Sequence, residues 1–437
     1  MSQATRILMA LVVGLGGGIA LAAVQPAAVE GTIAIAQPIG TAWLHALQMT
    51  IVPLVVSLLI TGVAATAAAA QAGRLAGRAI ALYIGLLFCS ALAAAILTPL
   101  FLEIVPLPRE SAAALRAAMI GAETIPTVPP LGQFFADVIP GNVVKAAAEN
   151  SFLSLIIFAL IFAFAMTRIA GELRVLLTQF FTAIRDTMLV VIEWVLWIGP
   201  VGVFALALVV GARAGSGAFG ALIHYIATVV AVGLTVSLAA YPLAVFGGRT
   251  RLGAYARAAL PSQAVAVSTQ SSLASLPAMV EGATDLGVPV ATSGVTLPLA
   301  VAIFRATGPA MNFAVAIYIA VWFEVPLSPA TLAVGTIVAT LTSLGSVSLP
   351  GTVSYVSAIA PVAATIGAPV APLGLLVAVE TIPDIMRTLG NVMMDLATTL
   401  TLSRRTRAAP GEDLVGHSSV SVSTTPEALN SPNASRT

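Results

Sequence analysis

The most informative part of the sequence is a stripe of four ionisable groups and one asparagine: Glu380, Asp384, Arg387, Asn391 and Asp395. At about 100° per residue, these positions fall within an arc of about 80° on one face of a helix. Apolar sequence flanks this polar stripe on both sides. A charge at the centre of a bilayer costs about 2.5–3.5 kcal/mol. In a membrane helix the polar stripe must therefore face a wet cavity, a substrate or an ion.

A structural alternative for the polar stripe is an internal salt bridge between Arg387 and Asp384. This pairing would leave Glu380 and Asp395 without a compensating charge. We therefore favour a binding role for the stripe as a whole.

A second candidate group is Arg305, which lies deep in an apolar run that begins at Leu297. Gly308-Pro309 follows it, and a proline inside a helix removes a backbone hydrogen bond and frees carbonyl groups. We interpret this segment as a broken helix that lines the same cavity as the polar stripe. The alternative is a simple proline kink with the Arg305 side chain reaching to the membrane surface, which its central position disfavours.

The composition indicates that a membrane holds these elements. The 437 residues are 59% hydrophobic and 8% charged, whereas soluble domains carry about 25% charged residues. The net charge of +1 gives no reason to expect a nucleic-acid partner. One cysteine and three distant histidines match no disulfide or zinc pattern, and we find no nucleophile–base pair. We predict an all-α polytopic membrane protein that has no cofactor and is not an enzyme.

Apolar segments of about 20 residues can cross a bilayer, and candidates occur at 5–24, 42–70, 76–102, 151–168, 178–211 and 219–247. The first could instead be a signal peptide, but its length favours a helix. The fifth exceeds one span, and we expect Gly199-Pro200 to kink it. With a cytoplasmic N-terminus, each arginine cluster falls on the cytoplasmic side and the 103–149 connection lies outside. We therefore expect both termini in the cytoplasm, with a disordered polar tail at 408–437.

Two later segments, 260–285 and 330–366, are apolar but interrupted by prolines and rich in Ser, Thr, Gly and Ala. Irregular backbone cannot face lipid, because its N–H and C=O groups would lack partners. We interpret both segments as re-entrant hairpins buried in protein, an arrangement that marks the binding site of a transporter. A pair of ordinary kinked spans is the alternative.

These motifs resemble those of the dicarboxylate/amino acid:cation symporters, the glutamate-transporter homologues, from the second span to about Arg407. The segment Asp384-x-x-Arg387-Thr388-x-x-Asn391-x-x-x-Asp395 matches the last helix of that family at every functional position. Two further segments are similar to the tips of its hairpins: Ser271-Ser272-Leu-Ala-Ser275-Leu-Pro277 and Ser343-Leu-Gly-Ser346-Val-Ser-Leu-Pro350-Gly351.

The resemblance implies eight transmembrane helices plus two re-entrant helical hairpins, in a homotrimer of a bacterial inner membrane that works as an elevator. The implied scaffold comprises helices 1 and 2 (1–73) and an extracellular loop with helices 4 and 5 (103–215). The implied transport domain comprises helix 3 (74–102), helix 6 (216–256) and a core of hairpin 1, helix 7, hairpin 2 and helix 8 (257–407).

The resemblance also implies roles for the site residues. Arg387 would hold a substrate carboxylate, which suits the fork of a guanidinium, and Asp384 would take an amino group. The rest of the substrate site would comprise Thr388, Asn391 and the hairpin tips at Ser271, Ser272 and Gly351. Asp395 is the implied cation ligand. The other candidates for binding or coupling Na⁺ or H⁺ are Asn391, Arg305, Glu380, Ser343 and Ser346.

Departures from the family concern the coupling ions. Where the family's seventh span carries Asn-Met-Asp-Gly-Thr, this chain has Phe304-Arg305-Ala306-Thr307-Gly308, and the third-span Thr-Ser ligands fall on Leu86 and Leu87. Leucine offers no oxygen, so we expect one sodium site to be lost. We hypothesise that Arg305 stands in for a coupling cation and that Glu380 couples protons, because burial disfavours a charged carboxyl. The alternative is that Arg305 only pairs with Glu380 or Asp395.

Together these features predict a secondary symporter that moves an acidic amino acid, such as aspartate or glutamate, or a C4-dicarboxylate with Na⁺ and/or H⁺. A carrier for dicarboxylates without an amino group is a rival, which Asp384 disfavours because it would repel a second carboxylate. A rival of another class is a degenerate member that acts as an uncoupled exchanger, an anion channel or a sensor.

Overall fold

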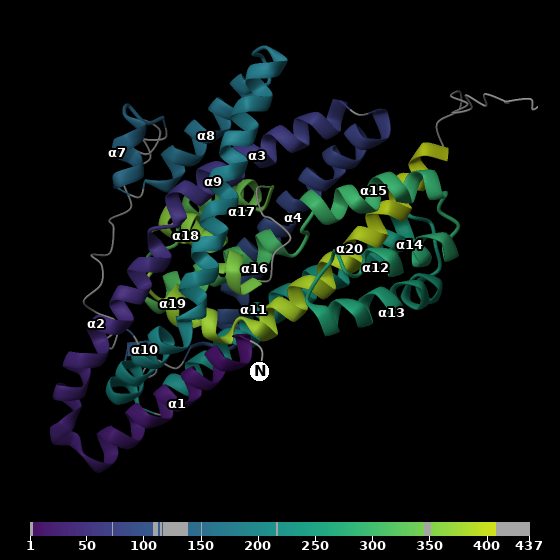
Figure 1. Ribbon diagram of the computed structural model, residues 1–437. Coiled ribbons are helices and arrows are strands. Elements are labelled where there is room, and N and C mark those ends of the chain that lie inside the picture. The colour runs from purple at the N-terminus through teal and green to yellow at the C-terminus, as the bar shows by residue number, and fades with distance from the viewer. Residues whose placement is uncertain are drawn as a thin grey trace, which may run out of the picture.

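The computed structural model describes residues 3–71, 73–107, 112–113, 116, 139–149, 151–215, 217–344 and 351–407. Every regular element among these residues is helical (Figure 1). Helical stretches long and apolar enough to cross a membrane are Thr5–Val24, Pro26–Ala68, Arg74–Ile104, Gly171–Trp197, Gly217–Gly247 and Val290–Trp322. This architecture agrees with the predicted all-α polytopic membrane protein.

The first expected span is helix α1 (Gln3–Val24), and the third is α4 (Arg74–Ile104). The second, expected at 42–70, is instead divided between α2 (Val29–Gln48) and α3 (Ile51–Gln71). Glu30, Gln37 and Pro38 lower the hydropathy at the start of α2. Polar residues lower the hydropathy of a segment without preventing a helix. Hydropathy therefore placed the start of this helical region too late in the chain.

The expected kink near Gly199-Pro200 is confirmed. Helix α9 (Gly171–Trp197) ends directly before α10 (Gly199–Ala214), and Pro200 lies in the first turn of α10, where its missing N–H costs nothing. The preceding helices are α7 (Val143–Ala148) and α8 (Phe152–Met166). Helix α10 packs closely on α1, because a Cβ at Gly211 would lie only 2.2 Å from the carbonyl oxygen of Leu15.

Each of the two segments predicted as re-entrant hairpins contains a pair of helices that pack on each other. Helices α13 (Leu252–Thr269) and α14 (Leu276–Asp285) pack on each other and are joined by residues 270–275, and Gln270 ends α13 in the left-handed conformation with φ 53°. Helices α17 (Pro329–Leu344) and α18 (Gly351–Thr365) also pack together. Residues 345–350, including Ser346, lie outside the described residues.

The predicted broken helix is formed by α15 (Val290–Ile303) and α16 (Gly308–Trp322), with residues 304–307 between them. Beyond the second hairpin come α19 (Leu373–Leu376), the 3₁₀ turn η3 (Val377–Val379) and α20 (Thr381–Arg407), which carries most of the polar stripe.

Helix α20 passes through the interior and contacts α11 (Gly217–Leu238), α13 and α15 (Figure 1). Between α11 and α13 lie α12 (Ala240–Pro242) and the π-helical turn η2 (Leu243–Gly247). The carboxyl-terminal half of α20 shares a buried apolar cluster with α4, α13, α14 and α15. A separate, larger cluster includes α1, α3, α10, α16 and α18. The polar stripe thus lies on a helix enclosed by protein rather than on the outside of the bundle.

Candidate functional site

The polar stripe is buried along its whole length. The exposed fractions are 0% for Glu380, 3% for Asp384, 5% for Arg387, 2% for Asn391 and 0% for Asp395. As predicted, the stripe faces the interior and does not present its charges to the outer surface. Buried charges require partners, because desolvation disfavours them unless hydrogen bonds or opposite charges compensate.

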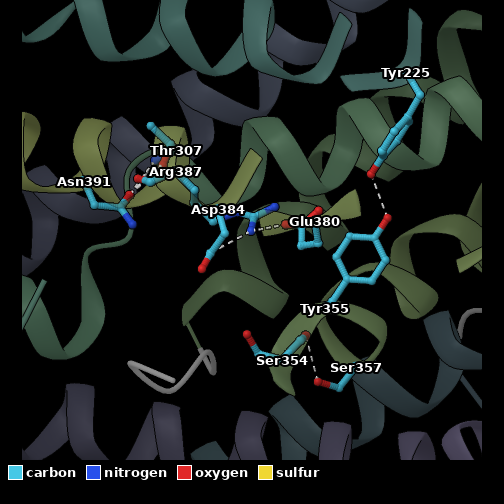
Figure 2. Close-up of polar contacts among 9 residues, drawn as sticks. All are labelled: Tyr225, Thr307, Ser354, Tyr355, Ser357, Glu380, Asp384, Arg387 and Asn391. Atoms are coloured by element: carbon cyan, nitrogen blue, oxygen red, sulfur yellow. Dashed lines mark hydrogen bonds and ion pairs between the residues drawn. The ribbon is translucent and has the colours of Figure 1, made fainter. Parts of the chain in front are cut away.

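Arg387 pairs with two carboxylates through one nitrogen. Its Nη1 donates to Glu380 Oε1 and, at 3.2 Å, to Asp384 Oδ1 (Figure 2). The salt bridge considered from the sequence joined Arg387 to Asp384 alone, so the expectation that this pairing leaves Glu380 uncompensated is wrong. Helical spacing favours partners three or four residues apart, whereas Glu380 reaches Arg387 over two turns.

The other edge of the Arg387 guanidinium makes no hydrogen bond within the described chain. Both Nε and Nη2 are buried without an acceptor among the described residues, and Glu380 Oε2 is buried there without a donor. The Nε and Nη2 groups point their N–H bonds in the same direction, which is the edge that binds a carboxylate through both of its oxygens. Glu380 and Asp384 therefore hold the guanidinium at Nη1, and the Nε and Nη2 edge is left to bind an anion through two hydrogen bonds.

Asn391 and Asp395 lie further along α20 and differ in how their oxygens are used. Asn391 Oδ1 lies 2.9 Å from the backbone nitrogen of Thr307 and 2.8 Å from its hydroxyl, whereas Nδ2 has no acceptor in the described part of the chain. Both Asp395 oxygens are buried with no donor among the same residues. Asp395 therefore suits a cation ligand, whereas the Asn391 oxygen is already engaged. Over the described ranges, no three His, Cys, Asp or Glu side chains form a metal-binding group.

Thr307 joins the broken helix to α20, a role that the sequence analysis missed. Its hydroxyl lies 2.7 Å from the carbonyl oxygen of Arg387 as well as near Asn391 (Figure 2). Thr307 occupies the N-cap position of α16 without capping that helix through its side chain. A threonine directly before a Gly-Pro helix start would ordinarily be expected to cap that helix with its hydroxyl, so the sequence alone did not indicate a contact with α20.

The backbone of the break is held from α4. Ser90 donates to the carbonyl oxygen of Ala306, and the ring of Tyr83 stacks on Phe304 with centroids 4.6 Å apart. One carbonyl that the break exposes is therefore used by a hydroxyl of the protein. Leu87, at one of the two positions where the sequence lacks an oxygen ligand, is fully buried in apolar surroundings.

Arg305 projects from the break into the same region as the polar stripe. It borders a cavity of about 20 Å³, and the described residues that line this cavity are Arg305, Gly308, Asn312, Ser354, Tyr355, Ala358 and Arg387. Arg305 also interacts electrostatically with Asp384 and Asp395. The broken helix and the polar stripe thus border one cavity, in which Arg387 is the member of the stripe among the described lining residues. The volume of this cavity suffices for about one water molecule.

Three neutral polar residues of the cavity wall were missed by sequence reasoning: Asn312, Ser354 and Tyr355. Tyr355 Oη lies 2.7 Å from Tyr225 Oη of α11, and both tyrosines are near enough to Glu380 to interact with its charge (Figure 2). Ser354 lies one helical turn after Gly351, which was predicted to lie at a hairpin tip. This closeness in sequence could have indicated that Ser354 belongs to the site.

The other predicted residues lie at varying distances from this centre. Thr388 is buried on α20, and Ser343 is buried, with its Oγ 3.7 Å from where a Cβ on Gly308 would be. Gly351 begins α18. Ser271 and Ser272 are half-buried in the turn between α13 and α14, where Ser271 Oγ accepts from the Ala274 backbone. These two serines are not among the residues that line the cavity.

The chain was also compared with known proteins. The model of the sodium:dicarboxylate symporter family matches residues 4–405. The proton/sodium-glutamate symport protein of Bacillus subtilis is 26% identical over 391 residues, covering 84% of this chain and 85% of that protein. The proton/glutamate-aspartate symporter of Escherichia coli is 26% identical over 417 residues, covering 92% of each chain.

A third relative is named for a different solute. The C4-dicarboxylate transport protein of Brucella anthropi is 24% identical over 387 residues, covering 84% of this chain and 82% of that protein. The relatives are transporters rather than enzymes, and they divide between acidic amino acids and dicarboxylates. Because the family model matches the chain nearly from end to end, with the broken helix and the polar stripe included, this protein belongs to the sodium:dicarboxylate symporter family.

Proposed function

We propose that this protein is a cation-coupled symporter that moves a small acidic amino acid or a C4-dicarboxylate across a bacterial inner membrane. The observation that carries the proposal is the bidentate edge of Arg387, which is buried, lacks an acceptor in the described chain and borders a cavity. A buried guanidinium edge of this kind is complementary to a carboxylate. The family membership supports the same class of solute.

In this proposal, Arg387 binds one carboxylate of the substrate. Glu380 and Asp384 hold the guanidinium through Nη1, which keeps Nε and Nη2 directed at the ligand. Asn391 offers its Nδ2 as a further donor. Thr388 and the hairpin tips at Ser271, Ser272 and Gly351 complete the site when it encloses a substrate.

The cavity is smaller than a four-carbon diacid, so binding requires its walls to separate. Ser354 and Tyr355 belong to α18, within the second hairpin, whereas Arg387 lies on the enclosed helix α20. We place the required movement in the hairpin, because α20 is packed on several sides by α11, α13 and α15.

Coupling is assigned to the region around Asp395. Its two unpartnered oxygens suit a cation, and Arg305 already places a positive charge in the same electrostatic environment. Ser90 donates to the carbonyl oxygen of Ala306, so a sodium ion at this carbonyl would share it with a hydroxyl. We therefore propose that Arg305 replaces part of the positive charge otherwise brought by sodium, with Ser343 and Ser346 near the remaining cation site and Glu380 as the proton-coupling group.

The proposed architecture is that of an elevator with eight transmembrane helices, two re-entrant hairpins and a homotrimeric scaffold. We assign 1–73 and 103–215 to the scaffold, and 74–102, 216–256 and 257–407 to the moving domain. The shared apolar cluster of α4, α13, α14, α15 and α20 supports grouping these elements in one body. Both termini are placed in the cytoplasm.

The test is uptake by the purified protein in liposomes. Radiolabelled aspartate, glutamate and succinate are offered with sodium and pH gradients imposed separately, and Arg257→Met serves as a control because Arg257 is exposed. We expect accumulation of at least one solute against its gradient, loss of accumulation in Arg387→Met and retention in the control. Uptake that only follows the solute gradient would favour the uncoupled exchanger, and no interaction with any acidic solute would refute the proposal.

A further inference from the structure

Two guanidinium groups from different helices border the central cavity. Arg387 comes from α20, and Arg305 comes from the break between α15 and α16. The other described residues of the cavity wall are neutral, and the polar ones among them are Asn312, Ser354 and Tyr355. Two cationic groups around one small cavity indicate a ligand with an anionic group at each end.

We infer that Arg305 is a second carboxylate-binding residue and that it makes the site selective for dicarboxylates that lack an amino group. This inference rests on the proposed function, which leaves open whether the substrate carries an amino group. One substrate carboxylate would bind the Nε and Nη2 edge of Arg387, and the other would bind Arg305.

The position of Asp384 explains why an amino group is disfavoured. A substrate ammonium needs an anionic partner, and Asp384 is the carboxylate that the family resemblance assigns to it. In this structure Asp384 already accepts a hydrogen bond from Arg387 at 3.2 Å and also interacts electrostatically with Arg305. An ammonium entering the cavity would therefore meet two positive charges, and like charges disfavour it.

The same two guanidinium groups also weaken the repulsion that a second substrate carboxylate would meet. From the sequence, Asp384 was expected to repel such a group. Asp384 accepts a hydrogen bond from Arg387 and also interacts electrostatically with Arg305. With its charge offset, Asp384 no longer excludes a diacid, and Arg305 supplies the attraction.

The backbone around Arg305 is fixed, which a specificity-determining residue requires. Phe304, directly before it, stacks on Tyr83, and the carbonyl oxygen of Ala306, directly after it, accepts from Ser90. Thr307 then binds Asn391 on α20. These contacts hold Arg305 at a constant position relative to Arg387.

Succinate and aspartate test the inference directly, because they differ only by the amino group. Affinities are measured by isothermal titration calorimetry on the purified full-length protein in nanodiscs, for wild type, Arg305→Met, Arg305→Lys and the exposed-residue control Arg257→Met. We expect wild type to bind succinate at least about tenfold more tightly than aspartate, because the positive charges of the site repel the ammonium group of aspartate. Arg305→Met should weaken succinate binding by about thirtyfold or more and should weaken aspartate binding much less.

Arg305→Lys retains the charge and should keep a preference for succinate, while Arg257→Met should bind as wild type. The wild-type ratio tests the inference even where a variant fails to fold. A wild type that binds aspartate as tightly as succinate, or an Arg305→Met variant with an unchanged ratio, would overturn the role of Arg305 and leave the proposed function standing. A wild type that binds and transports no acidic solute would instead overturn the proposed function, and this inference with it.

Discussion

Replacing Arg387 by methionine removes the positive charge shared by Glu380 and Asp384 while keeping much of the side-chain volume. Both carboxylates are buried, with exposed fractions of 0% and 3%. Neither can turn to water, so each must tolerate an uncompensated charge or take up a proton. We expect Arg387→Met to lower both the stability of the protein and its affinity for acidic solutes.

The magnitude follows from the geometry. For unit charges at the 3.2 Å that separates Arg387 Nη1 from Asp384 Oδ1, an effective dielectric constant of about 20 gives an attraction of about 5 kcal/mol. Desolvation offsets part of this attraction, and removing one partner of a buried pair costs about 3–5 kcal/mol. Binding should weaken by about 2–5 kcal/mol, or about 30-fold to 5000-fold in Kd, because a substrate carboxylate loses its partner.

A double-mutant cycle separates the two effects. Wild type, Glu380→Gln, Arg387→Met and the double variant are compared by thermal melting in nanodiscs and by calorimetric titration with succinate and aspartate. Glu380→Gln in the Arg387→Met background removes a stranded charge, so the double variant should be more stable than the sum of the single changes predicts. A coupling energy of about 0.5–3 kcal/mol is expected for groups in contact.

Affinity should respond differently from stability. The double variant should recover part of the lost stability but none of the lost affinity, because the bidentate edge of Arg387 is still missing. Additive stability effects would show that Glu380 and Arg387 do not form the ion pair. Undiminished affinity of Arg387→Met for every acidic solute would refute its assignment as the carboxylate ligand.

Three further predictions concern the surroundings of the site. Thr307→Val keeps the side-chain shape but removes the hydroxyl near Asn391, so the free energy of unfolding should fall by about 1–3 kcal/mol; an unchanged melting temperature would contradict this. A hydrogen bond from Arg116, together with its charge, holds the pKa of Glu324 below its usual value. Their mutual stabilisation is therefore present above the ordinary carboxyl pKa and lost as pH falls through the lowered value. Wild type and Arg116→Gln should show a small difference in melting temperature at neutral pH that disappears in acid, and a difference independent of pH would exclude the pair as its source. Finally, wild-type uptake should depend weakly on sodium and Arg305→Met uptake more steeply, and wild-type uptake that is steeply cooperative in sodium and indifferent to pH would rule out Arg305 as a substitute cation.

Charges and prolines within apolar sequence were the features that sequence alone interpreted well. The buried polar stripe and the break after Arg305 both follow from the cost of placing charges or irregular backbone in lipid, which leaves few alternatives. The division between α2 and α3 was missed, because polar residues such as Gln37 reduce hydropathy without preventing a helix.

The partners within the site were harder to predict. Glu380 binds Arg387 over seven residues, a spacing at which side-chain length and the local turn decide whether contact occurs. Asn312, Ser354 and Tyr355 are ordinary polar residues in their own helices, and only the packing of α18 beside α16 places them around one cavity. Such contacts depend on tertiary structure, which no local pattern specifies.

The hydrogen bonds of Thr307 have an electrical consequence. Because they join the broken helix to α20, Arg305 and the polar stripe would move as one charged body in the proposed elevator. With every group ionised, three carboxylates and two guanidinium groups give that body a charge of −1. In an elevator, a potential of 100 mV acting on one charge contributes about 2.3 kcal/mol, or about fiftyfold in the ratio of the two end states. A membrane that is negative inside would therefore drive the empty carrier outward, ready to load from the external side.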